Sequence, residues 1–129
     1  MELFPFQASL NKNVEMIMVG HIVFPGLDES GTPASHSYSI TTELLRNEWG
    51  FDGIIITDGM EMGGLTESTW AGESSVRAVE AGADILLLPM DVDHAIASLI
   101  QAVKSGRISE KRINQSVKRI WNMKQKIGI

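Results

Sequence analysis

The chain has 129 residues, 43% of them hydrophobic and 21% charged, which is the composition of one globular domain with a single core. Its net charge of −5, with Lys and Arg scattered along the sequence, argues against a binder of nucleic acid or of membrane surfaces. The absence of cysteine excludes disulfides and thiolate chemistry, and together with an N-terminus unlike a signal peptide it favours a cytoplasmic location.

The first third of the chain predicts a short helix, a strand, a long loop and a second helix. Pro5 suits the first turn of a helix, and the uninterrupted apolar run Met16–Val19 predicts a buried parallel strand. Several Gly and Pro residues then predict an ordered loop, after which Ser37 or Ser39 can cap a helix. The expected bounds are 6–13 for the first helix, 16–19 for the strand, 22–37 for the loop, and 37 or 39 to about 49–50 for the second helix.

A second apolar run, Ile54–Thr57, is followed at once by a carboxylate. Its four β-branched residues suit a strand that is buried on both faces. Asp58 is therefore expected at the carboxyl end of this strand, where α/β folds place their catalytic groups. On the residues alone, a functional carboxylate and an Asx-turn that only shapes the loop are equally compatible with Asp58.

The rest of the chain repeats the same arrangement. A loop over Met60–Gly72 and a helix over Glu73–Ala81 lead to a third apolar run, Ile85–Leu88, which Pro89 stops. Two helices follow, starting at Asp91 or Asp93 and at Ser109. Their expected buried stripes are Ile96, Leu99, Ile100 and Val103 in the first and Ile113, Val117, Ile120 and Trp121 in the second, with Lys111, Arg112, Lys118, Arg119 and Lys124 as a solvated face.

Three strands, each followed by a loop and a helix, indicate successive βα units and a parallel sheet. Right-handed crossovers then place the three strand-end loops on one edge, so His21, Asp58 and Pro89–Asp91 are expected to lie near one another. Asp52 and Asp84 precede strands and are expected to shape turns at the opposite edge.

Several segments together carry a resemblance to a known family. They are Met16–His21, Pro25–Asp28, Thr32–Ser35, Gly50–Gly53 leading into Thr57–Met62, Ala81–Pro89 and Ser105–Ser109. In this order they resemble the C-terminal part of the catalytic (β/α)8 barrel of glycoside hydrolase family 3, in its β-N-acetylhexosaminidase branch. The resemblance covers nearly all of the chain and implies an α/β fold of three parallel βα units, similar to strands six to eight of a TIM barrel. Residues 1–129 are then one partial catalytic domain, an incomplete barrel.

By this resemblance Asp58 is the nucleophile of a retaining enzyme that hydrolyses terminal N-acetylglucosamine-type β-glycosides without a cofactor. His21 resembles a residue of the sugar pocket, and Met60, Met62 and Met90 are packing residues or walls of that pocket; Met60 is taken as substrate-binding. Trp70 either stacks on a sugar or anchors its loop. The family's acid/base histidine has no counterpart in this sequence, so the chain alone is expected to be inactive.

Other interpretations have less support from the residues. No set of His, Asp and Glu has the spacing of metal ligands, no Gly-rich run opens a helix to hold phosphate, and Glu61 is expected to be a cap. Unpaired strands at both edges predict self-association or pairing with a missing N-terminal barrel half. The alternative to the enzyme is a truncated, non-catalytic relative that acts as an assembly domain.

Overall fold

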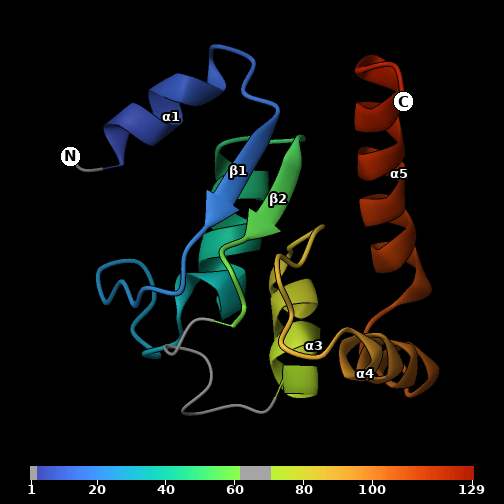
Figure 1. Cartoon of the computed structure of the whole chain (residues 1–129). Helices are drawn as coiled ribbons and strands as arrows, with labels where there is room; N and C mark the ends of the chain where they lie inside the picture. The colour runs from blue at the N-terminus through green and yellow to red at the C-terminus, as the bar shows by residue number, and fades with distance from the viewer. Residues whose placement is uncertain (1–2, 62–70) are drawn as a thin grey trace.

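A computed structural model describes residues 3–61 and 71–129. Figure 1 shows a small parallel sheet at the centre, with α1 on one side of it and the long helix α5 on the other. This is the α/β fold with parallel strands that the repeating pattern predicts. The elements in chain order are α1 (Phe4–Leu10), β1 (Met16–Val19), the 3-10 helix η1 (Ala34–His36), the π-helix η2 (Ser39–Glu48), β2 (Ile54–Thr57), α3 (Ala71–Ala81), α4 (Val92–Lys104) and α5 (Glu110–Lys126).

The two strands pair in parallel register, from Met16 opposite Ile54 to Val19 opposite Thr57. On one face, Val19 and the fully buried Ile55 pack against apolar side chains of η2 and form the main core. The other face of β1 is open, because Met16 and Met18 are 41% and 55% exposed. The expectation that Ile54–Thr57 is buried on both faces is therefore close to the observation for β2, whereas the expectation that Met16–Val19 is a buried strand is wrong, although its parallel pairing is confirmed.

The third apolar run lies beside β2 but forms a bridge rather than a regular strand. Ile85 pairs in parallel with Ile56, and the backbone N–H of Thr57 donates to the carbonyl of Ile85 at 3.1 Å. The run then breaks because Leu88 has a positive φ of 45° and Pro89 has no N–H to donate.

The helices lie close to their expected positions, with differences at their ends. The 3-10 helix η1 lies inside the segment expected to be a loop, and α3 begins at Ala71, inside the second expected loop. Asp91 caps α4 and Ser109 caps α5, each accepting a hydrogen bond from the backbone N–H three residues later. Most of the loop expected over residues 60–72, including Met62 and Trp70, lies outside the described residues.

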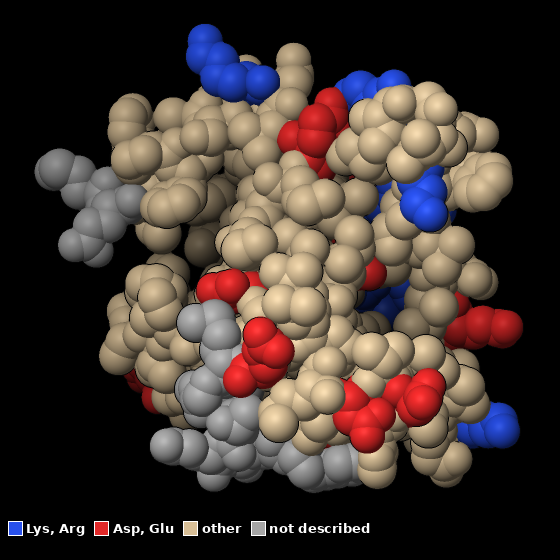
Figure 2. Space-filling model, in the orientation of Figure 1, with Lys and Arg blue, Asp and Glu red and all other residues tan. Residues whose placement is uncertain are grey.

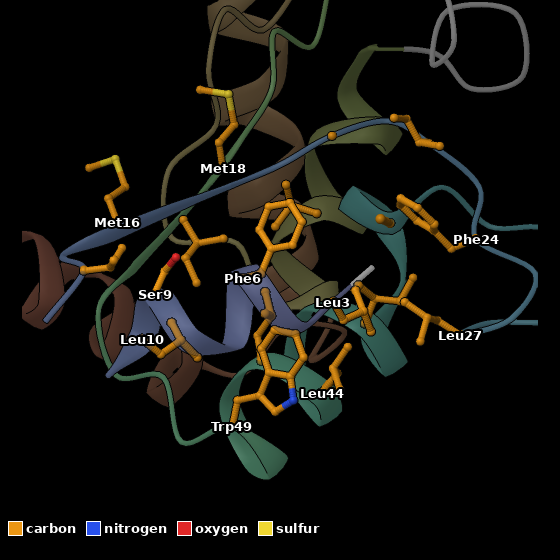
Figure 3. A pocket seen from close by; sticks show the side chains of 18 residues that line it. Leu3, Phe6, Ser9, Leu10, Met16, Met18, Phe24, Leu27, Leu44 and Trp49 are labelled. Atoms are coloured by element: carbon orange, nitrogen blue, oxygen red, sulfur yellow. The ribbon is translucent and has the colours of Figure 1, made fainter. Parts of the chain in front are cut away.

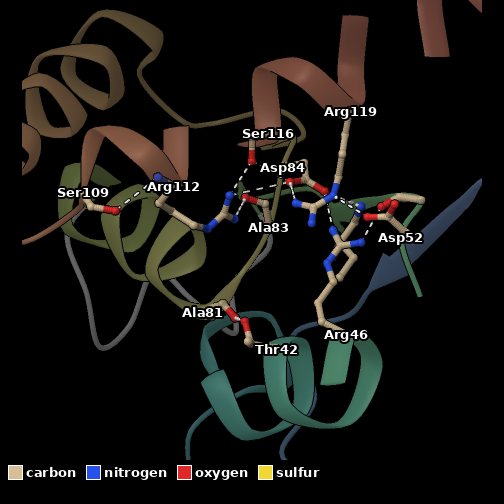
Figure 4. A network of polar contacts seen from close by, with 12 residues as sticks. Thr42, Arg46, Asp52, Ala81, Ala83, Asp84, Ser109, Arg112, Ser116 and Arg119 are labelled. Carbon is tan, nitrogen blue, oxygen red and sulfur yellow. Dashed lines mark hydrogen bonds and ion pairs between the residues drawn. The ribbon is translucent and has the colours of Figure 1, made fainter. Parts of the chain in front are cut away.

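The amino-terminal edge of the sheet is held by one buried carboxylate, that of Asp84 (Figure 4). Its side chain is 0% exposed and lies 2.5 Å from Arg46 of η2, and 3.2 Å and 3.6 Å from Arg119 and Arg112 of α5. Ser116 of α5 also donates to it at 2.5 Å, and a backbone N–H of β2 at 3.0 Å. Asp84 therefore joins η2, β2 and α5, and the expectation that Arg112 and Arg119 form a solvated face is wrong.

Much apolar surface remains exposed on the last two helices. Ile96 and Ile100 of α4 are 51% and 49% exposed, and Val117 and Trp121 of α5 are 56% and 61% exposed. The stripes expected to be buried are thus only partly covered. In Figure 2 most of the visible face is neither acidic nor basic, with separate Lys and Arg side chains toward its top and right and Asp and Glu side chains on its central and lower part.

Candidate functional site

Asp58 stands at the carboxyl end of β2, as the sequence predicts. Its backbone N–H donates to the carbonyl of Val19 at 2.9 Å, which continues the β1–β2 ladder by one residue. The side chain turns back, because its Oδ1 accepts a hydrogen bond from the N–H of Gly59 at 2.8 Å. The half-buried carboxylate is therefore fixed at the edge of the sheet where parallel strands open into loops.

His21 joins the end of β1 to the loop that follows Asp58. Its Nε2 lies 3.1 Å from the carbonyl oxygen of Gly59, and its Nδ1 lies 2.7 Å from Oγ of Ser35 on η1. The structure thus brings the β1 loop, η1 and the β2 loop together around one imidazole. Ser35 carries no role in the sequence interpretation, although it stands in the Thr32–Ser35 segment on which the family resemblance depends in part.

The third run reaches the same edge. The N–H of Met60 donates to the carbonyl of Leu87 at 2.9 Å, and the N–H of Leu87 donates to Oγ1 of the buried Thr57 at 3.0 Å. The Met60 side chain is only 4% exposed and packs against Ala78 and Ala83, so it lies beneath the edge rather than above it. All three apolar runs therefore end together, as parallel geometry requires.

His36 forms a second, separate histidine contact next to the first. Its Nε2 lies 3.1 Å from Oγ of Ser74 on α3. Burial, and after it the nearby His21 and Arg77, lower the pKa of His36 to about 4, so this imidazole is neutral at physiological pH. His36 has no role in the sequence interpretation. No local pattern in the sequence indicates that its side chain faces α3.

Within residues 3–61 and 71–129, no group of three or more His, Cys, Asp or Glu side chains is placed to hold a metal ion. None of the helices in this described part of the chain combines the length and apolar character needed to span a membrane. Glu61 is exposed, and Asp52 is an exposed partner of Arg119.

A parallel α/β domain with a fixed carboxylate at the carboxyl ends of its strands belongs to the class whose active sites form at that edge. Comparison with known proteins defines the family. Residues 1–123 match the N-terminal domain of glycosyl hydrolase family 3, and the chain belongs to this family. The hydrolase family indicated by the sequence motifs is thereby confirmed.

Solved and curated relatives agree with this assignment. A family 3 β-N-acetylglucosaminidase from Paenibacillus sp. str. FPU-7 shares 40% identity and superimposes with a TM-score of 0.92, over 97% of this chain and 24% of that one. β-Hexosaminidase A of Pseudoalteromonas piscicida is 29% identical over 98% of this chain and 24% of its own length. A β-N-acetylglucosaminidase/β-glucosidase of Cellulomonas fimi is 26% identical over 96% and 24% respectively. The chain thus spans about a quarter of the length of these relatives.

Proposed function

We propose that this chain supplies the nucleophile of a retaining β-N-acetylhexosaminidase that removes terminal N-acetylglucosamine-type residues from β-glycosides. The observation that supports this proposal is the position of Asp58, whose carboxylate follows β2 directly and is oriented by the N–H of Gly59. In this mechanism one carboxylate oxygen attacks the anomeric carbon, the leaving-group oxygen departs, and water later releases the sugar from the resulting ester.

A retaining site also needs a proton donor about 5 Å from the nucleophile. This sequence has no segment like the family's acid/base loop, and we infer that the 129 residues alone turn over substrate weakly or not at all. General acid–base assistance typically contributes about 10² to 10⁴ in rate, and a substrate whose leaving group needs a proton should show this loss most strongly.

His21 and Met60 complete the proposed sugar-facing part of this chain. Since both nitrogens of His21 have partners within the protein, its contact with a sugar would use the carbon edge of the ring. Met60, at 4% exposure, would form part of the floor beneath the sugar. Substrate binding by these two residues stays a prediction.

The role of Asp58 can be tested without the missing proton donor. Dinitrophenolate leaves without protonation, so dinitrophenyl N-acetyl-β-glucosaminide should glycosylate the chain, and mass spectrometry of its peptides should place the sugar on Asp58. The Asp58→Asn variant should show no adduct, whereas Glu61→Gln, which changes an exposed carboxylate three residues away, should keep it. Absence of the adduct from the unaltered chain, or its persistence in Asp58→Asn, would contradict the proposed role.

The surface beside β1 supports a second proposal, that a further copy of this chain covers it in solution. A groove of about 460 Å³ runs between α1, η2 and the loop after β1, and its lining is almost entirely apolar (Figure 3). Among the described residues, no strand pairs with the outer edge of β1, and the side chains of Met16 and Met18 on its open face are exposed. An unpaired strand edge beside an apolar groove favours pairing with another chain, and a second copy presents the same complementary surface.

This groove also favours the alternative function, a non-catalytic assembly domain, because its lining does not include Asp58. Sedimentation at micromolar concentration should show a dimer or larger species. Met18→Glu should shift the population toward monomer, since it places a charge on the exposed apolar face of β1. Ile129→Glu, at the exposed C-terminal residue, should leave the population unchanged. A stable monomer of the unaltered chain would contradict the association, and a larger species without any Asp58 adduct would favour the assembly function.

A further inference from the structure

We propose that Ser35 and His21 form a positioning pair that holds the Gly59–Met60 peptide, and through it the Asp58 carboxylate, in the geometry needed for attack. This inference rests on the proposed role of Asp58 as the nucleophile. Ser35 touches neither Asp58 nor a substrate in this arrangement. It acts on the imidazole of His21, and the imidazole acts on the loop.

The hydrogen bonds themselves define which nitrogen of His21 carries the proton. The carbonyl oxygen of Gly59 can only accept, so the Nε2 atom that lies 3.1 Å from it must be the donor. In a neutral imidazole the Nδ1 atom is then unprotonated, and it accepts from the hydroxyl of Ser35 at 2.7 Å. The carbonyl of Gly59 and the hydroxyl of Ser35 therefore together favour the Nε2–H tautomer, the neutral form that can donate to the loop.

Ser35 is itself held rigidly, which makes this selection effective. The residue is only 1% exposed, and its backbone N–H donates to the carbonyl of Gly20 at 3.2 Å. The preceding residue, Ala34, is also fixed on both sides. Its N–H donates to the carbonyl of Ile22 at 2.9 Å, and its own carbonyl accepts from the hydroxyl of Thr41 at 2.9 Å. The hydroxyl of Ser35 is thus presented to His21 from a buried turn with little freedom to move.

The peptide that His21 contacts is fixed on its other side as well. The Gly59–Met60 peptide accepts from His21 through its carbonyl and donates to the carbonyl of Leu87 through its N–H at 2.9 Å. The peptide plane is therefore anchored to the β1 loop and to the third run at the same time. Since the N–H of Gly59 bonds to Oδ1 of Asp58, a rotation of this segment would also release the carboxylate.

The tautomer of His21 can be read directly by long-range proton–nitrogen correlation of the isotopically labelled chain. At a pH of about 8 we expect His21 in the Nε2–H form, because the carbonyl of Gly59 accepts from Nε2 and the hydroxyl of Ser35 can donate to Nδ1. Ser35→Ala should give a mixture of both tautomers. Ser74→Ala is the matched control, because it removes a neighbouring buried hydroxyl that serves His36 and not His21. An Nδ1–H tautomer in the unaltered chain, or no change in Ser35→Ala, would overturn the proposal.

Two substitutions of His21 separate the bond to the loop from the bond to Ser35. His21→Gln can place an amide N–H where Nε2 stands and so keep the donor to Gly59, whereas the shorter His21→Asn reaches only the position of Nδ1. Amide hydrogen exchange of Gly59 should be about tenfold faster in His21→Asn, which corresponds to about 1.4 kcal/mol, and close to the unaltered rate in His21→Gln. Equal exchange rates in the two variants would contradict the role of the Nε2–H donor.

The link to the nucleophile is tested with the dinitrophenyl glycoside. Formation of the Asp58 adduct should be about tenfold slower in Ser35→Ala and unchanged in Ser74→Ala. The tautomer and exchange measurements need no sugar, so they stand even if Asp58 forms no adduct. Equal adduct rates in the two serine variants would show that the pair does not position the nucleophile.

Discussion

Among the charged residues that the structure describes, Asp84 is the one whose replacement by Asn should destabilise the domain most. The substitution keeps the size of the side chain but leaves Arg46 and Arg112, whose side chains are 10% and 19% exposed, without their counter-charge. Burial already lowers the pKa of both guanidinium groups, and Asp84 opposes that effect. Breaking a buried ion pair by removing one partner costs about 3–5 kcal/mol, a large part of the roughly 5–15 kcal/mol that stabilises a domain.

Urea denaturation followed by circular dichroism measures this loss. With a slope of about 1.5 kcal/mol per molar urea, the midpoint of Asp84→Asn should fall by about 2–3 M. Asp52→Asn is the control, because Asp52 is also a partner of Arg119, at 3.4 Å, but its side chain is 94% exposed. That variant should change the free energy of unfolding by less than about 1 kcal/mol. If the two variants unfold at the same urea concentration, the assignment of Asp84 as the buried anchor is refuted.

Three further predictions concern pH and backbone space. Burial lowers the pKa of His36 to about 4 in the folded domain, so as the pH falls the unfolded chain is protonated at this residue before the folded domain is. The free energy of unfolding should therefore decrease between about pH 6.5 and 4. The urea midpoint of His36→Gln should lack this decrease. Hydrogen bonds from Arg107 lower the pKa of Glu73 to about 2. The ion pair of Glu73 with Arg107 therefore stabilises the folded domain above about pH 4.5, and this contribution is lost as the pH falls toward 2. Since the pair is solvent-accessible, Glu73→Gln should lower the free energy of unfolding by at most about 1 kcal/mol at neutral pH and by almost nothing near pH 2. Gly82→Ala should lower the melting temperature more than Gly106→Ala. Both glycines have a positive φ, so alanine is strained at either position. Of the two, only at Gly82 would the new Cβ meet another residue, since it would lie 2.5 Å from the hydroxyl of Thr42 on η2.

The order and type of the elements could be predicted from the sequence because hydrophobic runs and caps are local signals. The run Ile54–Thr57 forms β2, and Asp91 and Ser109 cap the helices that they precede. The third strand was not predictable to the same degree, because a left-handed Leu88 depends on how the chain meets its neighbours. The run Ile85–Leu88 has the composition of a strand but keeps only a bridge to β2.

The charged residues show where local reasoning is insufficient. Arg112 and Arg119 have the spacing of a solvated helix face, yet with Ser116 they form a line of polar groups at i, i+4 and i+7 directed at Asp84. The spacing of these three residues is visible in the sequence, but Asp84, the carboxylate that they share, is about 30 residues away in the chain and its side chain is buried. The helical apolar stripes gave the opposite error, since Val117 points outward despite its spacing.

At the candidate site, the sequence located the carboxylate but not its support. Asp58 follows from the rule that parallel strands present functional groups at their carboxyl ends, and the structure has it there. The pairing of His21 with Ser35 and Gly59 joins residues 14 and 38 positions apart, which no local pattern encodes. Only the folded arrangement of η1 against both strand ends makes this contact visible.

The Asp84 network lies at the amino-terminal edge of the sheet, whereas Asp58 and His21 lie at the carboxyl edge. The network that anchors the scaffold is thus physically separate from the candidate site. Mutant libraries confined to the largely exposed loop 22–32 should therefore retain a high proportion of folded members, because they leave the arginine-bound carboxylate and the buried Met60 untouched. On the proposed function, directed evolution toward a different sugar should begin in that loop.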